Sequence, residues 1–321
     1  MDSHKIIVLI ASHIFNKKRI HFLMESIKSI LSQTQKTKAY ISISFDTPEL
    51  KEEFTKSCIC SDEITYILQE HKTPQMRHYK ILCDTLIEKE GPLTWVLFCD
   101  DDDTYVPTRV ETFLNKINHN TNALSISGND PINFVGIYEA KENHRSMRHE
   151  YWCYCIRFSI LQKFYSRIDA FPDVIDHKCC DILFAEYIRR LSFDNLFDNI
   201  ETPMYNYRRG DDNMDSITGF ITQEESKIHK SNPPPITDIA IIDYLLKWNE
   251  YLNKNLHYYL HDTFVRTVMG TSFNKIVQSE FLRDYPYIDF IDMIHTEKML
   301  NIHTMVKEAC NKSFDIPITF H

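Results

Sequence analysis

One stretch of the sequence, WVLFCDDDDTYVP at residues 95–107, joins a wholly apolar run to four consecutive aspartates. Residues 95–99 contain no charged residue, which is the pattern of a strand buried on both of its faces. The run stops abruptly at residues 100–103. Thr104 and Pro107 then suit a helix start, because proline costs nothing in a first turn whose N–H groups have no partner. The stretch therefore predicts a buried strand, an acidic turn and a helix.

The residues before this stretch alternate between strand and helix patterns. Apolar runs predict three strands, at residues 6–11, 40–45 and 64–68. The first strand is followed by apolar residues at near-helical spacing, namely Phe22, Ile27, Ile30 and Leu31. A second helix is predicted to run through Leu86 after the polar loop at residues 69–77. Such alternation indicates an α/β fold with a mostly parallel sheet flanked by helices.

The residues after the acidic turn continue the α/β pattern and then change. A helix is predicted by the inward-facing set Val110, Phe113, Leu114 and Ile117. Two strands are predicted at residues 123–127 and 152–158, and a helix at residues 182–191. The run Asn-Pro-Pro-Pro at residues 232–235 cannot be helical and indicates a stiff connector. We therefore expect a first domain at residues 1–231 and a helical C-terminal extension at residues 232–321.

Composition narrows the class of protein. The chain has 321 residues, a net charge of -9 and nine cysteines without the C-x-x-C spacing of a zinc site. Its acidity disfavours a nucleic-acid partner, since many basic side chains are needed to replace phosphate counterions. The first apolar run is too short for a signal peptide, and no run approaches the roughly 20 apolar residues of a membrane span. We expect a soluble, cytoplasmic protein with free thiols.

The four aspartates at the end of a strand have two explanations. In open α/β sheets ligands bind outside the carboxyl ends of the strands, and adjacent buried carboxylates repel one another unless a cation compensates them. Oxygen-only ligands suit Mg²⁺ or Mn²⁺, which would bridge two phosphates of a nucleotide sugar and neutralise the departing diphosphate. The alternative is a solvated acidic turn in which Asp103 caps the next helix. The buried-type strand that runs directly into the cluster favours the metal site.

The stretch at residues 95–106 resembles the W-x-x-x-x-D-D-D-T-Y-V segment of Fringe-like β-glycosyltransferases, and the strand-to-D-x-D step of inverting GT-A enzymes. The resemblance implies a GT-A fold, with a nucleotide-binding half at about residues 1–105 and an acceptor half at about residues 106–231. It also implies a divalent metal and a sugar-nucleotide donor. Asp103 would be the main metal ligand, with Asp101 and Asp102 facing metal or ribose. Because there are four aspartates, their alignment with the D-x-D motif can shift by one position. Asp100 is therefore also a candidate for donor binding.

Other positions match the donor site of such enzymes. By the same resemblance, Asp46 after the second strand would meet the base or ribose, although a turn residue before Pro48 is an equal alternative. Gln75 and Arg77 lie in the segment that approaches the nucleotide, and arginine suits phosphate because it binds two oxygens at once. Ser12 would offer backbone contacts to the base. Further along the chain, two arginines would close over the diphosphate, Arg208 and Arg209.

An inverting transfer needs a base that deprotonates the acceptor hydroxyl, and a carboxylate is the usual choice. Asp181 resembles the base of inverting enzymes, with Asp176 as the alternative; an ordinary first-turn aspartate is the structural explanation. Trp152 and Tyr154 suit a wall for the acceptor sugar, although core packing is as good an explanation.

The sequence thus predicts a glycosyltransferase that uses a UDP-sugar, or a GDP-sugar, and a glycan, protein or small-molecule acceptor. Two rivals remain. A nucleotidyltransferase also gathers aspartates around metal, but usually has a basic groove or a glycine-rich phosphate loop, and this chain has six glycines and no such loop. A non-catalytic sugar- or nucleotide-binding protein on the same fold is the other.

Overall fold

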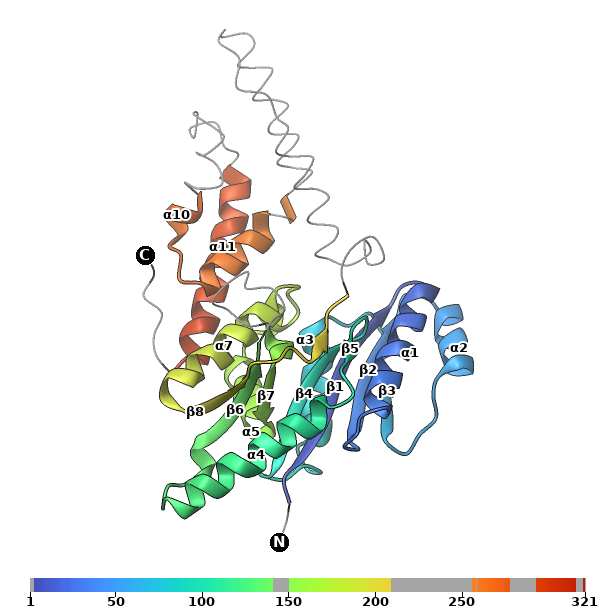
Figure 1. The fold of residues 1–321 in the computed structure, drawn as a ribbon. Helices are drawn as coiled ribbons and strands as arrows, with labels where there is room; N and C mark the ends of the chain where they lie inside the picture. The colour runs from blue at the N-terminus through green and yellow to red at the C-terminus, as the bar shows by residue number, and fades with distance from the viewer. Residues whose placement is uncertain are drawn as a thin grey trace. The chain divides into compact units, whose positions relative to one another are not determined.

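The computed structural model describes residues 3–140, 150–208, 256–257, 259–277, 293–315 and 320. Its strands are β1 (Lys5–Ile14), β2 (Lys38–Phe45), β3 (Ile64–Leu68), β4 (Thr94–Asp100), β5 (Thr104–Tyr105), β6 (Phe134–Glu139), β7 (Tyr154–Arg157), β8 (Leu196–Ile200) and β9 (Tyr205–Asn206). Its helices are α1 (Lys17–Leu31), α2 (Pro48–Ser57), α3 (Gln75–Leu86), α4 (Arg109–Ile126), α5 (Phe158–Ile168), α6 (Pro172–Ile175), α7 (Cys180–Asp194), α10 (Phe273–Val277) and α11 (Met293–Ser313), with 3₁₀ turns η1 (Pro131–Asn133) and η2 (Tyr151–Cys153). Figure 1 traces them along the chain.

The described strands form a seven-stranded sheet in the order β3-β2-β1-β4-β7-β6-β8 and a small sheet of β5 and β9. The pairs β1–β2, β1–β4, β2–β3 and β6–β8 are parallel. Only β7 is antiparallel to its neighbours in the large sheet, β4 and β6. The prediction of a mostly parallel sheet flanked by helices is therefore confirmed.

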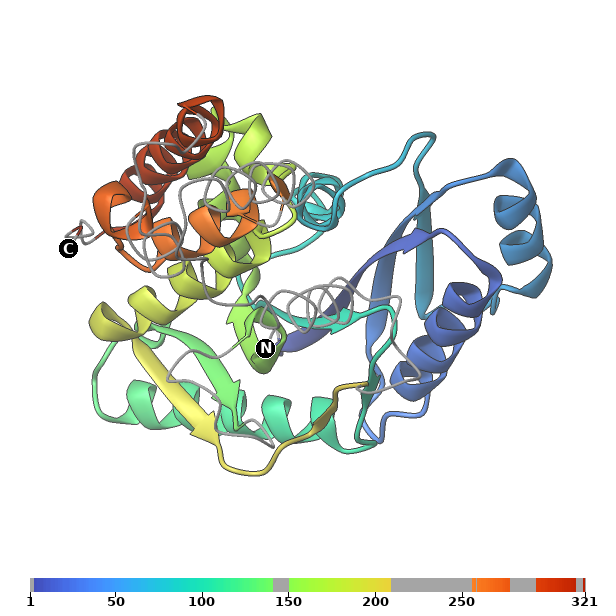
Figure 2. The same cartoon turned by 90° about the horizontal axis from the view of Figure 1, so that it is seen from above.

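The central strands are apolar because both of their faces are covered. Alternate residues of β1 and β4, such as Val8 and Leu97, belong to a core cluster shared with α1 and α4. The residues between them, such as Leu9 and Phe98, are also fully buried and point to the face that α3 covers. Figure 2 shows α1 and α4 on one side of the sheet and α3 on the other.

The strand order reverses beside β1. From β1 the chain continues through β2 and β3 on one side, while β4 pairs with β1 on the other. In open α/β sheets such a reversal opens a crevice at the carboxyl ends of the strands, and ligands bind there. The register brings Ala11 of β1 opposite Asp100 of β4. Ser12, the next residue of β1, therefore lies beside the aspartates that follow Asp100.

Several predicted elements differ from the observed ones. Residues 123–127, predicted as a strand, lie at the end of α4, because its inward-facing set continues to Thr121 and Gly128 at φ 74° ends the helix as a left-handed residue. The predicted strand at residues 152–158 is shorter: Trp152 lies in η2 and Phe158 begins α5. Helix α4 begins at Arg109, since Thr104 and Tyr105 pair with β9 as strand β5.

The chain forms two compact units, one of Met1–Tyr207 with Lys312–Ile316 and the other of Arg208–Asn311 with Pro317–His321. The large sheet belongs to the first unit. The second contains α10 and most of α11, while the proline run at residues 232–235 lies outside the described residues. In the described part of the chain, no helix is long and apolar enough to cross a membrane.

Candidate active site

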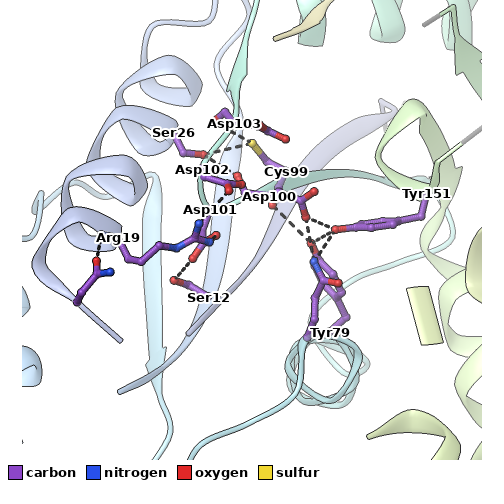
Figure 3. Close-up of polar contacts among 12 residues, drawn as sticks. Ser12, Arg19, Ser26, Tyr79, Cys99, Asp100, Asp101, Asp102, Asp103 and Tyr151 are labelled. Atoms are coloured by element: carbon purple, nitrogen blue, oxygen red, sulfur yellow. Dashed lines mark hydrogen bonds and ion pairs between the residues drawn. The ribbon is translucent and has the colours of Figure 1, made fainter. Parts of the chain in front are cut away.

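The acidic turn lies at the carboxyl end of β4, and its carboxylates point to two sides (Figure 3). Asp100 ends the strand, and the turn closes where the Asp103 N–H donates to the Asp100 carbonyl at 3.3 Å. Asp101, Asp102 and Asp103 are 4%, 9% and 1% exposed. Nor does Asp103 cap a helix, because the N-cap of α4 is Thr108. The turn is thus a buried cluster of carboxylates rather than a solvated cap.

A guanidinium compensates one side of this cluster. Arg19 donates to Asp102 Oδ2 at 2.8 Å and to Asp101 Oδ1. The Ser12 hydroxyl donates to the other Asp101 oxygen at 2.6 Å. Both oxygens of Asp101 are therefore bound within the protein.

Helix α1 places Arg19 there. The Asn16 side chain accepts a hydrogen bond from the Arg19 N–H at 3.0 Å, so the arginine lies in the capped first turn. No acidic residue occupies that turn, which instead carries Lys17, Lys18 and Arg19. Basic residues are unfavourable at the positive end of a helix. This unfavourable charge pattern is the sequence signal by which Arg19 could have been predicted.

The other side of the cluster holds Asp100 against α3 and η2. Its Oδ1 accepts hydrogen bonds from the Tyr151 hydroxyl and, at 3.0 Å, from Gln75 Nε2. Gln75 also donates to the Tyr151 hydroxyl at 2.9 Å, and the Tyr79 hydroxyl lies 3.4 Å from the Tyr151 hydroxyl oxygen. Gln75 therefore meets the acidic cluster, whereas Tyr151 and Tyr79 were not anticipated from sequence.

Burial and mutual repulsion change the proton affinities of these groups. Burial, followed by repulsion from Asp103 and Asp102, raises the pKa of Asp100 well above its ordinary value, against the opposing effect of the Tyr151 hydrogen bond. Burial raises the pKa of Asp101 to about 6, although the Arg19 charge opposes the increase. Burial alone would lower the pKa of Arg19, but Asp101 and Asp102 raise it instead. The cluster therefore favours the binding of positive charge, whether protons or a cation.

Asp46 lies just past β2, beside the end of β1. Its backbone N–H donates to the Ile14 carbonyl at 3.0 Å. Its Oδ1 lies 2.9 Å from His13 Nε2 and 3.4 Å from Lys72 Nζ. Desolvation alone would raise the pKa of Asp46, but the His13 hydrogen bond and the charge of Lys72 lower it. Asp46 is thus a partly exposed carboxylate that stays ionised.

Arg77 and the two candidate bases lie together near Cys180. Arg77 Nε donates to Asp176 Oδ1 at 2.7 Å, and its Nη2 to the Pro172 carbonyl at 3.2 Å. Asp181 is half-buried in the first turn of α7. Asp176, Asp181 and Arg77 all influence the pKa of the Cys180 thiol, which burial raises. Arg77 therefore neutralises Asp176.

The Trp152 ring belongs to a stack of three aromatic rings. Its ring lies 4.2 Å from that of Tyr205 and 5.7 Å from that of Tyr207, at 15° and 12° between planes. Its carbonyl accepts from Arg109 Nη2 at 2.7 Å, and the Tyr205 hydroxyl accepts from the Asp100 N–H at 2.8 Å. The half-buried indole thus adjoins the acidic cluster through Tyr205.

The remaining predicted residues are less informative. Tyr154 is 2% exposed and belongs to the core. Arg208 is half-buried, and Arg209 lies outside the described residues.

The carboxylates suit a hard divalent cation, since their donors are all oxygen. Among the described residues, no group of three or more His, Cys, Asp or Glu side chains is arranged to hold a metal. Mg²⁺ is commonly held by one or two carboxylates together with substrate phosphates, rather than by an all-protein cage. The predicted ligands Asp101, Asp102 and Asp103 are carboxylates of this kind, and Arg19 already binds Asp101 and Asp102.

The comparisons with known proteins found similar structures but no matching family. No protein-family model and no curated protein matches the chain. A structure of residues 1–349 of TarS from S. aureus with UDP covers 94% of this chain and 90% of its own, at 12% identity and a TM-score of 0.44. A second structure of that TarS segment has 10% identity and a TM-score of 0.42, with the same coverage of 94% and 90%. The 4-diphosphocytidyl-2C-methyl-D-erythritol synthase of Anaerococcus prevotii covers 68% of this chain and 96% of its own, at 12% identity and a TM-score of 0.39.

At TM-scores this low the similarities assign neither family nor ligand to the chain. The fold class follows from the chain's own strands: a mostly parallel sheet flanked by helices, with helices in the C-terminal part.

Proposed function

We propose that this protein is a metal-dependent glycosyltransferase that transfers a sugar from a nucleotide-diphosphate sugar, with a UDP-sugar as the first candidate. The observation that carries the proposal is the buried carboxylate cluster at the carboxyl ends of β1 and β4, where the strand order reverses. A cluster with this excess of negative charge favours a cation, and a cation at a sheet switch point suits a diphosphate.

The donor would lie along the carboxyl ends of β2, β1 and β4. Asp46 and Ser12 lie at the ends of β2 and β1, where the base and ribose would bind. Asp102 and Asp103 would hold Mn²⁺ or Mg²⁺, which when bound would neutralise charge on the leaving diphosphate. Gln75 orients Asp100 beside them. Arg208 and Arg209 stay predicted contacts of the diphosphate.

Asp181 would act as the base. In an inverting transfer the acceptor oxygen forms a bond to the anomeric carbon while the bond from that carbon to the diphosphate oxygen breaks. The hydroxyl proton passes to the Asp181 carboxylate, and the bond's electron pair leaves with the nucleoside diphosphate. The alternative base, Asp176, has its carboxylate bound by Arg77. Trp152 would face the acceptor sugar, because flat rings suit the C–H surface of a sugar.

The assay is release of UDP or GDP from nucleotide sugars in the presence of Mn²⁺ and a panel of acceptors. Asp181→Asn should lower turnover by about 10²-fold or more, the usual contribution of a general base, and leave UDP affinity unchanged. Asp173→Asn is the matched control, since Asp173 is an exposed first-turn aspartate of the neighbouring α6. Full turnover in Asp181→Asn would show that Asp181 is not the general base.

The same samples separate the rival functions. A nucleotidyltransferase would release pyrophosphate from a nucleoside triphosphate and a sugar phosphate, and would release no UDP from a UDP-sugar. A non-catalytic binding protein would bind nucleotide with Mn²⁺ and release no product. Either result would replace the glycosyltransferase assignment.

A further inference from the structure

A continuous file of polar side chains runs through the interior on the α3 face of the sheet and ends at Asp46. Its members lie on β2, α3 and β1 and on the loop after β3. In order they are Gln69, Ser42, His78, Ser44, His13 and Asp46. From Gln69 to His13, the successive donor–acceptor distances are 3.0, 2.8, 3.1 and 2.8 Å. At the end of the file, His13 Nε2 lies 2.9 Å from Asp46 Oδ1. Ser42, Ser44 and His78 are at most 1% exposed.

The two ends of the file determine the direction of its hydrogen bonds. The Asp46 carboxylate only accepts, so His13 Nε2 must carry the hydrogen. At the other end, the Gln69 amide nitrogen lies 3.0 Å from Ser42 Oγ and 3.4 Å from the Ile67 carbonyl. A carbonyl also only accepts, so this nitrogen is the donor. The hydrogen bonds of the file therefore run in one direction, from Gln69 as the first donor to Asp46 as the last acceptor.

Between these ends each group has one consistent role. Ser42 accepts from Gln69, so its hydroxyl hydrogen is directed to His78 Nδ1. The His78 ring then carries its hydrogen on Nε2 and donates to Ser44 Oγ, which also accepts from the Thr73 N–H at 3.3 Å. Ser44 in turn donates to His13 Nδ1. In the reverse direction a buried hydroxyl hydrogen of Ser42 would lack an acceptor within the file, which is costly.

The surroundings keep both rings neutral, as this direction requires. Burial lowers the pKa of His78 to about 3, with the charge of His13 in the same direction and the Thr73 backbone opposed. Burial and Lys72, the largest causes, lower the pKa of His13, as does Arg19, while Asp46 raises it. The charged or titratable groups that act on His13 are therefore Lys72, Arg19, Asp46 and His78.

We propose that His78 is a positioning residue for donor binding: through Ser44 it holds His13 in the Nε2–H tautomer, which fixes Asp46 by its Oδ1 and leaves Oδ2 for a hydroxyl or N–H of the nucleoside. Both His13 and Lys72 bond Oδ1. Within the described residues, Oδ2 has no hydrogen bond, and the Asp46 side chain is 37% exposed. A ribose hydroxyl or a base N–H supplies the donor that such an oxygen lacks. This inference rests on the proposed donor site.

The ring tautomers can be read without any ligand. Long-range ¹H–¹⁵N spectra of the full chain near neutral pH should show the hydrogen on Nε2 of both His13 and His78. Ser44→Ala removes the donor to His13 Nδ1 and leaves Asp46 alone to favour the Nε2–H form, so the Nδ1–H form of His13 should become detectable. A hydrogen on Nδ1 of either ring in the wild-type protein would overturn the proposal.

UDP titration with Mn²⁺ tests the functional consequence. Ser44→Ala and His78→Phe should each weaken UDP binding about tenfold, the effect of misplacing one charge-assisted hydrogen bond. His78→Gln can still donate to Ser44 and accept from Ser42, so its affinity should stay within about twofold. Should His78→Phe fail to fold, Ser44→Ala carries the test alone. The control is Thr37→Val, which removes a buried hydroxyl bonded to the Ile6 carbonyl at the opposite end of β2.

The two proposals fail in different ways. If the wild-type protein binds UDP and both Ser44→Ala and His78→Phe bind it equally well, His78 has no positioning role and the donor site stands. If the wild-type protein binds no nucleotide, the donor site fails, and the positioning role, which rests on it, fails with it. In that case the spectra still determine whether the file holds the Nε2–H tautomer.

Discussion

At the level of single residues, the acidic cluster is defined by partners far away in sequence. The four aspartates were recognisable because they follow a buried strand directly. Arg19 and Tyr151 were not, since they are separated from the cluster by 82 and 51 positions. A sequence pattern reports neighbours along one strand or helix, whereas these contacts depend on how α1 and η2 pack against the sheet. The candidate carboxylates were therefore predictable, and the side chains that set their charge were not.

The raised pKa values of Asp100 and Asp101 predict a stability that falls as the pH rises. A carboxyl group has a pKa near 3.9 when unfolded, so in this range the folded cluster binds more protons than the unfolded chain. The stabilisation is fully present below about pH 4 and is lost for Asp101 as the pH rises through about 6. Asp100→Asn removes one such group.

Urea unfolding between about pH 4 and about pH 7 measures this effect. The free energy of unfolding should fall less steeply with pH in Asp100→Asn than in the wild-type protein. Asp173→Asn, on the exposed surface of α6, should follow the wild-type curve. An unchanged slope in Asp100→Asn would mean that Asp100 is ionised at neutral pH in the folded protein.

At the level of helices and strands, the buried strands of the parallel sheet were predicted, whereas α2, α5, β6 and β8 were not. The strands at residues 6–11, 40–45, 64–68 and 95–99 were identified because their apolar runs are buried by helices on both faces. Strands β6 and β8 were missed, since β8 is half exposed and has no clear alternation. Helix α2 was missed although Thr47 caps it and Pro48 follows, because Pro48 was considered only as part of a turn after Asp46.

The N-caps of α1 and α2 give a matched pair of variants. Asn16 accepts from the Arg19 N–H at 3.0 Å, and Thr47 accepts from the Leu50 N–H at 3.3 Å. Loss of either cap should destabilise the protein by about 1 kcal/mol in urea unfolding. Only Asn16→Ala should also weaken UDP binding, because the first turn of α1 carries Arg19 to the acidic cluster. Equal UDP affinities in Asn16→Ala and Thr47→Ala would show that the position of Arg19 is unimportant for binding.

At the level of the whole molecule, a short segment near the C-terminus belongs to the sheet-containing unit. Residues Lys312–Ile316 form part of it. Phe314 is 5% exposed, with the Arg190 guanidinium 4.7 Å from its ring centre. Arg167 Nη1 donates to the Ser313 carbonyl at 2.6 Å, and Lys163 lies 3.2 Å from Asp315. Sequence patterns did not associate this segment with α5 and α7, because the partners are far apart in the chain: 148 positions separate Arg167 from Asp315.

Two variants in this segment separate packing from charge. Phe314→Ala removes a buried ring and should cost about 3 kcal/mol in the free energy of unfolding. Asp315→Asn breaks partly exposed ion pairs and should cost less than about 1 kcal/mol. Hydrogen exchange in Phe314→Ala should increase in α5 and α7 before it increases in β1 and β4. Equal costs, or exchange that spreads uniformly, would contradict the placement of this segment.

The most direct test of the donor site is calorimetric titration of the full chain with UDP and with GDP, each with and without Mn²⁺. We expect one nucleotide to bind, and only with metal. Asp103→Asn should abolish this metal-dependent binding, while Asp173→Asn should retain it. Binding that is unaffected by both Mn²⁺ and Asp103→Asn, or no binding of either nucleotide, would contradict a metal-dependent donor site at the carboxyl end of β4.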